Sequence, residues 1–486
     1  MSSPEVSPPN LYQAREPIFP RRVKGRFRNL KWAIMAVTLA IYYILPWLRW
    51  SRGPSLPDQA VLVDLANRRF YFFFIEIWPH EFYFIAGLLI MAGLGLFLFT
   101  SAYGRVWCGY ACPQTVWTDL FILTERWVEG DRNARVRLWN EPWSLRKLRL
   151  RFAKWSIWLL IAVMTGGAWV FYFTDAPTLL RNLLTGNAHP VAYMTIAILT
   201  ATTFVFGGFM REQICIYMCP WPRIQAAMMD ENTLTVAYRD WRGEPRGKIH
   251  RGEETRSQGG AKGDCIDCNA CVNVCPMGID IRDGQQLACI TCALCIDACD
   301  DVMDKIQKPR GLIDYMALQD EAAERAGEKP RSIRRHILRP RTLLYFTLWA
   351  GIGIALIAAL IMRSPFDLNV TPVRNPLYVT MSDGAIRNTY EMRLRNKLGQ
   401  EHDFALRLTD RAGEAIPGLI LTLEGADSQA LPVAANETRS QRIYVTAPTG
   451  SPLATTERSD VSLWVEDRGT GISREVGTVF HGKEKP

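Results

Sequence analysis

Eight of the twelve cysteines in this chain form two runs with the same spacing, and this feature constrains the fold most. The first run reads C-x2-C-x2-C-x3-C-P and consists of Cys265, Cys268, Cys271 and Cys275. The second run has Asp300 where the proline would stand and consists of Cys289, Cys292, Cys295 and Cys299. Bacterial ferredoxins use this spacing to hold [4Fe–4S] clusters.

Each run is expected to serve two clusters. Three thiolates at two-residue intervals wrap a short loop around one cluster, and the fourth thiolate reaches the other cluster. We therefore predict that one [4Fe–4S] cluster is held by Cys265, Cys268, Cys271 and Cys299. The other is predicted on Cys289, Cys292, Cys295 and Cys275. Zinc knuckles also use C-x2-C pairs, but two complete four-cysteine runs favour iron–sulfur clusters and one-electron transfer.

Five stretches of the chain are almost purely apolar and are each close to the ~20 residues that a helix needs to cross a bilayer. They are residues 32–48, 82–101, 156–174, 192–210 and 343–362. One such stretch could be a buried core helix, but five with basic flanks indicate spanning helices. The first is not followed by a small-residue cleavage site, so we expect an uncleaved spanning helix and not a signal peptide.

The distribution of lysine and arginine predicts the orientation in the membrane. Basic residues concentrate before residue 32, in the loop 132–154 and in the segment 331–341. These parts are expected on the cytoplasmic side, which makes the cysteine-rich segment cytoplasmic and everything after about residue 363 external. The net charge of +9 is then a topology signal, and nucleic-acid binding is not expected.

The outer segment changes to an alternation of apolar and polar residues, which is typical of half-buried strands. From Tyr378 to Phe480 this pattern predicts a seven-stranded, immunoglobulin-like sandwich that serves as a docking or structural module. The fold class is thus a multi-domain membrane protein with five spanning helices, a ferredoxin-like α+β domain and an all-β sandwich. The predicted parts are a basic tail 1–31, a four-helix region 32–236, a linker 237–262, a ferredoxin-type domain 263–310, a basic connector 311–342, the fifth helix 343–362 and the outer domain 366–486.

The remaining four cysteines form a duplicated motif, C-x-Y-x-C-P. Cys108 and Cys112 follow the second apolar stretch, and Cys215 and Cys219 follow the fourth. The motif indicates an internal repeat about an axis along the membrane normal, so we expect the two pairs face to face at one depth. If each motif continues its helix, the cysteines of a pair stand at i and i+4, with Cβ atoms ~5–6 Å apart. That is too far for a disulfide.

Four thiolates at one place form a soft ligand set that selects copper(I), zinc or iron–sulfur. Buried, inert cysteines and thiols that shuttle electrons without metal are the alternatives. None of the six histidines lies in an apolar stretch, which excludes a haem b held by histidines between the helices of this chain. No nucleotide-binding glycine motif is present.

The combination of ferredoxin run, five helices, paired C-x3-C-P motifs and outer sandwich closely resembles one family of Gram-negative bacteria. It is the cytochrome c oxidase accessory protein family called CcoG, also known as FixG or RdxA. The resemblance implies a protein of the bacterial inner membrane that acts in assembly of the cbb(3)-type oxidase as a reductase of copper(II) to copper(I). It also implies that the two runs are the cluster ligands and that Cys108, Cys112, Cys215 and Cys219 are the candidate copper site.

Two functions from different classes follow. The favoured hypothesis is an oxidoreductase in which a cytoplasmic electron donor supplies the clusters, copper(II) is reduced, and copper carriers or oxidase assembly factors receive the product. The alternative is a membrane electron conduit, from quinol or a cytoplasmic donor to a partner redox protein, without copper chemistry. A scaffold with structural clusters is a weaker third reading. The sequence leaves open whether the chain forms a homodimer.

Overall fold

The computed structural model describes residues 17–53, 56–248, 260–410, 413–425 and 430–483. Residues 1–16 of the predicted tail and 249–259 of the predicted linker therefore lie outside the described residues. The chain divides into two compact units. One comprises the described parts of Met1–Leu48 and Gln59–Leu356, and the other those of Arg49–Asp58 and Ile357–Pro486.

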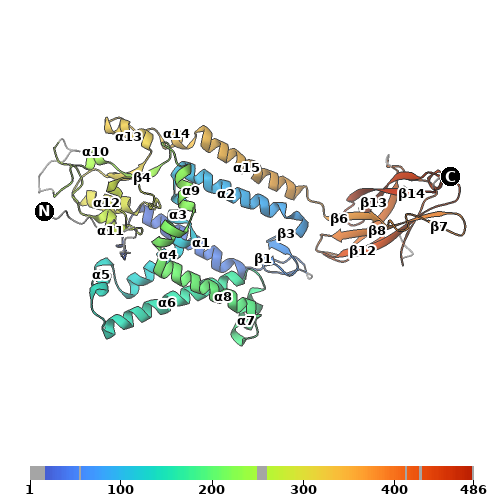
Figure 1. Ribbon diagram of the computed structural model, residues 1–486, viewed down its shortest axis with the longest axis horizontal. Helices are drawn as coiled ribbons and strands as arrows, with labels where there is room; N and C mark the ends of the chain where they lie inside the picture. The colour runs from blue at the N-terminus through green and yellow to red at the C-terminus, as the bar shows by residue number, and fades with distance from the viewer. Residues whose placement is uncertain (1–16, 54–55, 249–259, 411–412, 426–429, 484–486) are drawn as a thin grey trace, which may run out of the picture. The chain divides into compact units, whose positions relative to one another are not determined.

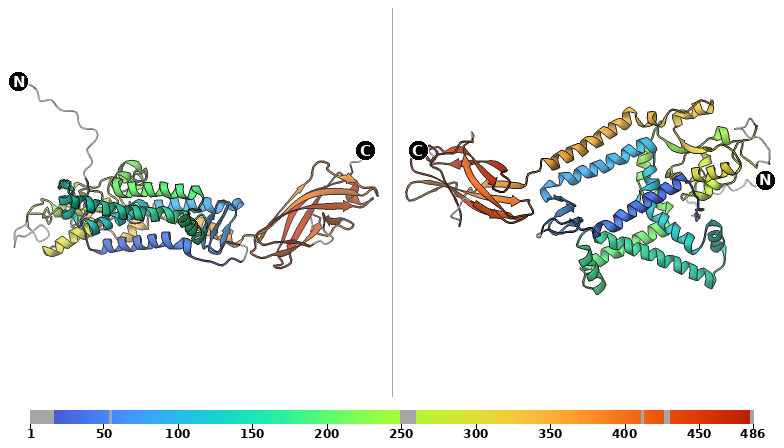
Figure 2. Two further views of the ribbon diagram at one scale, coloured as in Figure 1. Left: turned by 90° about the horizontal axis from the view of Figure 1, so that it is seen from below. Right: turned by 180° about the vertical axis from the view of Figure 1, so that it is seen from behind.

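Five helices of the described chain are long and apolar enough to cross a membrane, as the hydropathy pattern predicts. They are α1 (Arg26–Ile44), α2 (Tyr83–Tyr103), α6 (Leu145–Val170), α8 (Pro190–Thr203) and α15 (Pro340–Ile361). Short turns of 3-10 or π-helix extend three of them, namely η1 (Leu45–Trp47), η2 (Pro79–Glu81) and η3 (Phe204–Met210). Helices α2 and α15 lie side by side, as do α6 and α8 (Figures 1 and 2). Glycine permits the first contact, because a Cβ at Gly87 would lie 2.7 Å from the Leu356 side chain.

The loops between the spanning helices contain structure that the hydropathy pattern did not predict. The first loop forms a three-stranded antiparallel sheet of β1 (Val61–Asp64), β2 (Arg69–Phe72) and β3 (Ile75–Ile77). Three helices follow α2, namely α3 (Val106–Tyr110), α4 (Pro113–Val128) and α5 (Arg132–Asn140). Helix α7 (Ala176–Thr185) precedes α8, and the π-helix η4 (Ile214–Met218) and helix α9 (Trp221–Met228) follow η3.

The cysteine-rich segment is an α+β arrangement around helices α11 (Ala270–Val274) and α12 (Leu294–Lys305), with a 3-10 turn η6 (Ile281–Asp283) between them. A two-stranded antiparallel sheet pairs β4 (Thr235–Tyr238) with β5 (Ile313–Met316). Both strands lie outside residues 263–310, so the ferredoxin-type part draws on the chain on either side of that range. Helices α10 (Asp240–Gly243), α13 (Leu318–Arg325) and α14 (Ile333–Ile337) complete this region.

The second unit contains the immunoglobulin-like sandwich. Its described residues form nine strands, whereas the sequence pattern predicts seven. One sheet has the order β10-β12-β8-β6, and β7 also pairs with β8. The other sheet has the order β11-β9-β13-β14. The strands are β6 (Phe366–Pro372), β7 (Val379–Thr380), β8 (Ile386–Asn396), β9 (His402–Thr409), β10 (Ile420–Leu423), β11 (Ala430–Val433), β12 (Thr438–Ala447), β13 (Arg458–Asp467) and β14 (Ser473–His481). A short helix α16 (Pro452–Thr455) precedes β13.

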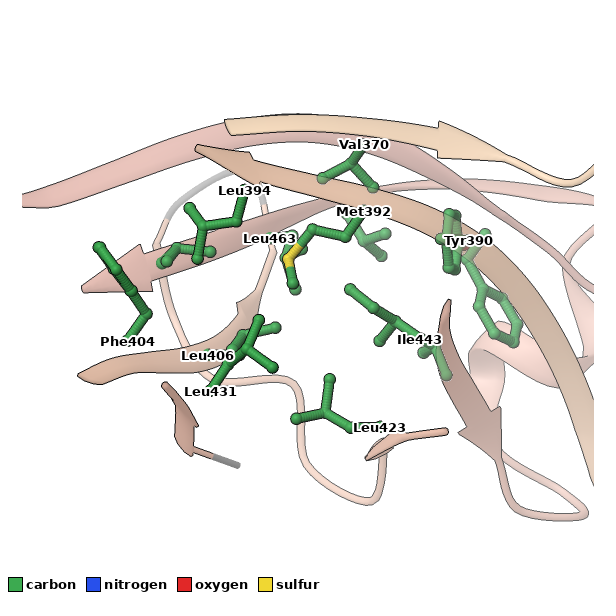
Figure 3. Packing of buried hydrophobic residues seen from close by; sticks show 14 of the residues in the cluster. Val370, Tyr390, Met392, Leu394, Phe404, Leu406, Leu423, Leu431, Ile443 and Leu463 are labelled. Carbon is green, nitrogen blue, oxygen red and sulfur yellow. The ribbon is translucent and has the colours of Figure 1, made fainter. Parts of the chain in front are cut away.

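The predicted alternation forms the core of this sandwich. Met392 and Leu394 of one sheet face Phe404 and Leu463 of the other, and all four side chains are buried (Figure 3). The strand count differs from seven because the alternation already begins at Phe366, before the predicted start, and because β7 has only two residues. A strand that short leaves no periodic signal.

Candidate functional site: two cysteine groups packed together

The eight cysteines of the two runs line two adjacent cavities. Four line the first cavity, namely Cys265, Cys268, Cys271 and Cys299. Four others line the second, namely Cys275, Cys289, Cys292 and Cys295, and Cys271 also reaches its wall. The fourth cysteine of each run thus lies with the first three of the other run. Each cavity offers four thiols and otherwise mainly apolar walls, so the residues present fit an iron–sulfur cluster in each. The individual ligand assignments stay a prediction.

The backbone around the two cavities repeats the same unusual conformation. Asp267 and Asn269 flank Cys268 with φ of 53° and 55°. Thr291 and Ala293 flank Cys292 in the same way, with φ of 53° and 59°. Residues other than glycine rarely adopt positive φ, and such strain clusters at functional sites. Here it turns the chain back on itself on both sides of the middle cysteine, so that three thiols share one cavity.

Burial raises the pKa of these thiols. The pKa of Cys271 rises to about 11 and that of Cys275 to about 12, mainly because the surrounding protein excludes water. A metal binds the thiolate, so binding releases these protons.

The C-x-Y-x-C-P motifs do not continue their helices, which corrects the expected i, i+4 geometry. Cys108 lies in α3 and Cys215 in η4, but Cys112 and Cys219 have extended backbone, with ψ of 129° and 122°. The proline after each second cysteine favours this conformation, because its ring crowds a helical residue before it. The helix of the motif therefore ends one or two residues before the second cysteine, and a new helix begins at or just after the proline.

The two copies of the motif also begin alike. Four residues before the first cysteine, Gly104 has φ 60° and ψ −127°, and Arg211 has φ 38° and ψ −107°. Glycine adopts such angles readily, whereas arginine does so only under constraint. The Arg211 side chain supplies that constraint, since it donates hydrogen bonds to the Gly208 carbonyl at 2.8 Å and to the Glu125 carboxylate.

The four motif cysteines gather at one place. Besides burial, the nearby Cys112, Cys215 and Cys219 raise the pKa of the Cys108 thiol, and Cys112 and Cys219 also raise that of Cys215. Burial raises the pKa of the Cys108 thiol to about 12 and that of Cys215 to about 11. The Cys108 thiol donates a hydrogen bond of 3.0 Å to the side-chain oxygen of Gln225, a fully buried residue of α9.

The first motif packs directly against the ferredoxin-type loop. The Tyr110 hydroxyl donates a hydrogen bond of 3.1 Å to the Cys292 carbonyl. A Cβ at Gly109 would lie 2.6 Å from the Ile290 carbonyl oxygen, so only glycine fits there. Cys108 and Cys215 belong to the same apolar cluster as Cys275 and Cys292. The structure therefore brings the two predicted cysteine groups together.

A second contact, which the sequence analysis missed, joins the ferredoxin-type part to the first spanning helix. The Asp297 carboxylate lies between Cys295 and Cys299 on α12 and accepts hydrogen bonds from the backbone N–H groups of Phe27 and Arg28, at 3.2 and 2.7 Å. These are donors of the first turn of α1 that no helical carbonyl can satisfy. Asp297 thus caps α1 from about 270 residues away in the sequence.

Within the described residues, no group of three or more histidine, cysteine, aspartate or glutamate side chains forms a ready-made site for a single metal ion. This holds for the cysteines of the two runs and for the four motif cysteines alike.

Comparison with known proteins identifies the family. Protein RdxB of Cereibacter sphaeroides is 69% identical over 99% of this chain and 100% of its own length. Protein RdxA of the same organism is 63% identical over 97% of this chain and 98% of its own length. This chain belongs to the FixG/RdxA family. The nitrogen fixation protein FixG of Rhizobium meliloti is 54% identical over 90% of this chain and 88% of its own length.

Family models match three parts of this FixG/RdxA protein. A 4Fe-4S dicluster domain matches residues 210–318, a 4Fe-4S binding domain matches 84–132, and the IG-like fold at the C-terminal of FixG matches 356–483. The crystal structure of a FixG-related protein from Vibrio parahaemolyticus aligns with 25% of the chain and all of its own, at 17% identity and a TM-score of 0.22, too weakly to support an argument. The protein is an iron–sulfur redox protein with an immunoglobulin-like domain, and its five apolar helices indicate a membrane protein.

Proposed function

We propose that this protein is a membrane-anchored electron-transfer protein that reduces copper(II) to copper(I) during assembly of a cbb(3)-type cytochrome c oxidase. The observation that carries the proposal is the packing of the first C-x3-C-P motif against the loop of Cys292. The Tyr110 hydrogen bond and the close approach at Gly109 hold the two cysteine groups in one unit. A reductase needs such a unit, because its electron carrier and its substrate site must be neighbours.

The resident cofactors in this proposal are two [4Fe–4S] clusters in the crossed ligand sets given above, and when bound they supply one-electron carriers. The chain's own residues shape their cavities. The left-handed residues at Asp267, Asn269, Thr291 and Ala293 turn the thiols inward. Apolar walls exclude water.

Copper is the substrate in this proposal. The thiolates of Cys108, Cys112, Cys215 and Cys219 would bind it, since soft sulfur ligands favour copper(I). Each copper(II) gains one electron, and a cytoplasmic redox protein loses one. Because the Cys108 and Cys215 thiols are protonated at neutral pH in the metal-free protein, copper binding must release their protons. Gln225 would act as a positioning residue that holds the Cys108 side chain.

The proposed orientation follows from the basic residues next to the helix ends. The amino terminus and the ferredoxin-type domain lie in the cytoplasm, and the immunoglobulin-like domain lies in the periplasm. The electron donor is then cytoplasmic, and copper carriers or oxidase assembly factors take up copper(I).

One observation favours a second candidate function. The matched 4Fe-4S binding domain of residues 84–132 includes Cys108 and Cys112. In this alternative the four motif cysteines hold a further iron–sulfur cluster, and the protein is a membrane electron conduit between quinol or a cytoplasmic donor and a partner redox protein.

Metal analysis of anaerobically purified protein, loaded with one equivalent of copper(I), separates the two candidates. The copper reductase is expected to contain about eight iron atoms and one copper, because two cubane clusters carry four irons each. Cys108→Ser and Cys215→Ser should lose the copper and keep the iron. About twelve irons with no retained copper, falling to about eight in both variants, would establish the conduit with a third cluster.

A further inference from the structure

A cavity of about 610 Å³ lies near the motif cysteines, at the same end of the spanning helices. The proposed electron transfer does not use this cavity. Its lining comes from residues 17–19, α4, α5, the first half of α6 and the end of η3. Five basic side chains line it, namely Arg135, Lys147, Arg151, Lys154 and Arg211.

This cavity carries an excess of positive charge. Among the described residues, two carboxylates pair with four of the five basic groups, and Lys147 pairs with neither. Glu125 binds Arg135 and Arg211, and Glu129 binds Lys154 at 2.9 Å and Arg151 at 3.2 Å. Three positive charges thus remain without a neutralising partner in the cluster. Buried charge in excess is costly unless an opposite charge joins it.

The most buried of these cations has a guanidinium donor without a hydrogen-bond partner among the described residues. Arg135 is 1% exposed, and its Nη1 has no hydrogen-bond partner among the described residues. Its guanidinium lies over the Phe19 ring at 5.0 Å, and its Nη2 binds Glu125. A buried guanidinium with a vacant donor is the arrangement that binds an anion such as phosphate.

The neighbouring face of α6 is apolar and exposed. Lys147, Arg151 and Lys154 line the cavity. Leu148 and Phe152 directly follow two of these residues, and Leu159 directly follows the cavity-lining Trp158. These three apolar side chains are 52%, 70% and 47% exposed. These three residues follow the i, i+4 and i+11 spacing of one helix face. The indole groups of Trp139, Trp143 and Trp155 line the cavity. Tryptophan collects where a bilayer meets water.

We propose that this cavity binds the headgroup of an anionic phospholipid, whose acyl chains lie along the exposed face of α6. Charge complementarity selects the headgroup, and the apolar stripe of α6 selects a lipid over a free anion. Basic pockets between spanning helices bind phosphate headgroups in the same way.

The lipid site shares Arg211 with the segment that leads to Cys215. Arg211 has strained backbone four residues before that cysteine, and its guanidinium contacts Glu125 at the cavity wall. A bound headgroup would therefore stabilise η3 and η4. This inference does not depend on whether the motif cysteines bind copper.

The test uses delipidated full-length protein in detergent with phosphatidylglycerol or phosphatidylcholine of identical acyl chains. We expect native mass spectrometry to show phosphatidylglycerol retained at one tight site per chain, with a raised melting temperature, and phosphatidylcholine to do neither. Equal binding of the two lipids would overturn the proposal, and stabilisation by inorganic phosphate equal to that by phosphatidylglycerol would assign the cavity to a free anion.

Charge-matched variants of α6 locate the site. Lys147→Gln/Arg151→Gln removes two charges from the cavity, and Arg146→Gln/Arg149→Gln removes two charges from exposed positions of the same helix. The first pair should weaken phosphatidylglycerol binding about 30-fold, as expected for two headgroup contacts, and the second should leave it unchanged. Equal losses in both would refute the site.

Lys147→Gln alone is the folding control. The Lys147 ammonium donates to the Trp139 and Glu141 carbonyls and lies over the Trp143 ring, and it forms no ion pair among the described residues. It should weaken binding while the iron content is kept. Phosphatidylglycerol binding that appears only after deletion of residues 1–16 would assign the cavity to the amino-terminal segment instead.

Discussion

Replacing Asp297 by alanine should loosen the ferredoxin-type part from the first spanning helix. The carboxylate is buried and accepts two backbone hydrogen bonds from the start of α1, at 3.2 and 2.7 Å. A hydrogen bond to a charged group contributes about 1.5–3 kcal/mol, and loss of a cap costs about 0.5–2 kcal/mol. Because the two bonds share one carboxylate, their losses are not additive. We expect Asp297→Ala to destabilise the protein by about 2–4 kcal/mol.

The assay follows the visible iron–sulfur absorbance during anaerobic heating of the full-length protein. Asp297→Ala should lower the midpoint by several degrees. Asp301→Ala on the same helix is the matched control, since the Asp301 side chain is 58% exposed and, among the described residues, forms an ion pair with Lys305 alone. An exposed pair of this kind contributes about 0.3–0.5 kcal/mol. Asp297→Asn, which keeps an acceptor oxygen but no charge, should fall between the two.

Gly25 gives an independent check of the same contact. A Cβ at this position would lie 2.2 Å from the Asp297 carboxyl carbon. Gly25→Ala should therefore break the cap too, and the double variant should be no less stable than the worse single one, because both changes remove one interaction. Equal midpoints for Asp297→Ala and Asp301→Ala, or additive losses in the double variant, would refute the capping account.

Two further predictions concern the contacts of the motif cysteines. Tyr110→Phe removes the hydrogen bond to Cys292 and should destabilise the protein by about 1 kcal/mol and slow electron transfer to copper. Tyr217→Phe, at the matching but 72% exposed position, should change neither the stability nor the rate. Equal effects of the two substitutions would show that the Tyr110 contact is not used. Gln225→Leu removes the hydrogen-bond acceptor of the Cys108 thiol and should weaken copper(I) binding, measured by competition with a chelator, while the iron content stays the same. An unchanged affinity for copper(I) would contradict the positioning role of Gln225.

The sequence predicts the parts of this protein that depend on local patterns. The ferredoxin spacing places four cysteines on each of two cavities because the loops are short and the helices α11 and α12 follow directly. Hydropathy predicts the five spanning helices for a similar reason, since each depends only on about 20 consecutive residues. The alternation of apolar and polar residues predicts the core of the sandwich, although the two-residue strand β7 is too short to show this alternation.

The contacts between these parts could not be predicted, because they depend on packing between distant segments. Asp297 stands in an acidic helix and resembles a solvated residue in sequence, yet it caps a helix about 270 positions away. The duplicated Tyr110 and Tyr217 look equivalent, but only Tyr110 reaches the Cys292 loop. One signal was available: aligning the two motifs places Arg211 opposite Gly104 and so marks the position of positive φ.

The most direct test of the central claim mixes cluster-reduced protein, freed of excess reductant, with one equivalent of copper(II) and follows both by rapid-freeze EPR. The account predicts that the copper(II) signal disappears while the reduced-cluster signal falls by about half, because one copper(II) takes one electron from one of the two clusters. In Cys108→Ala or Cys215→Ala, with the clusters intact, both signals should persist much longer. Equal rates in the variants and the unchanged protein would mean that copper meets the clusters without the paired thiols, and the account would be wrong.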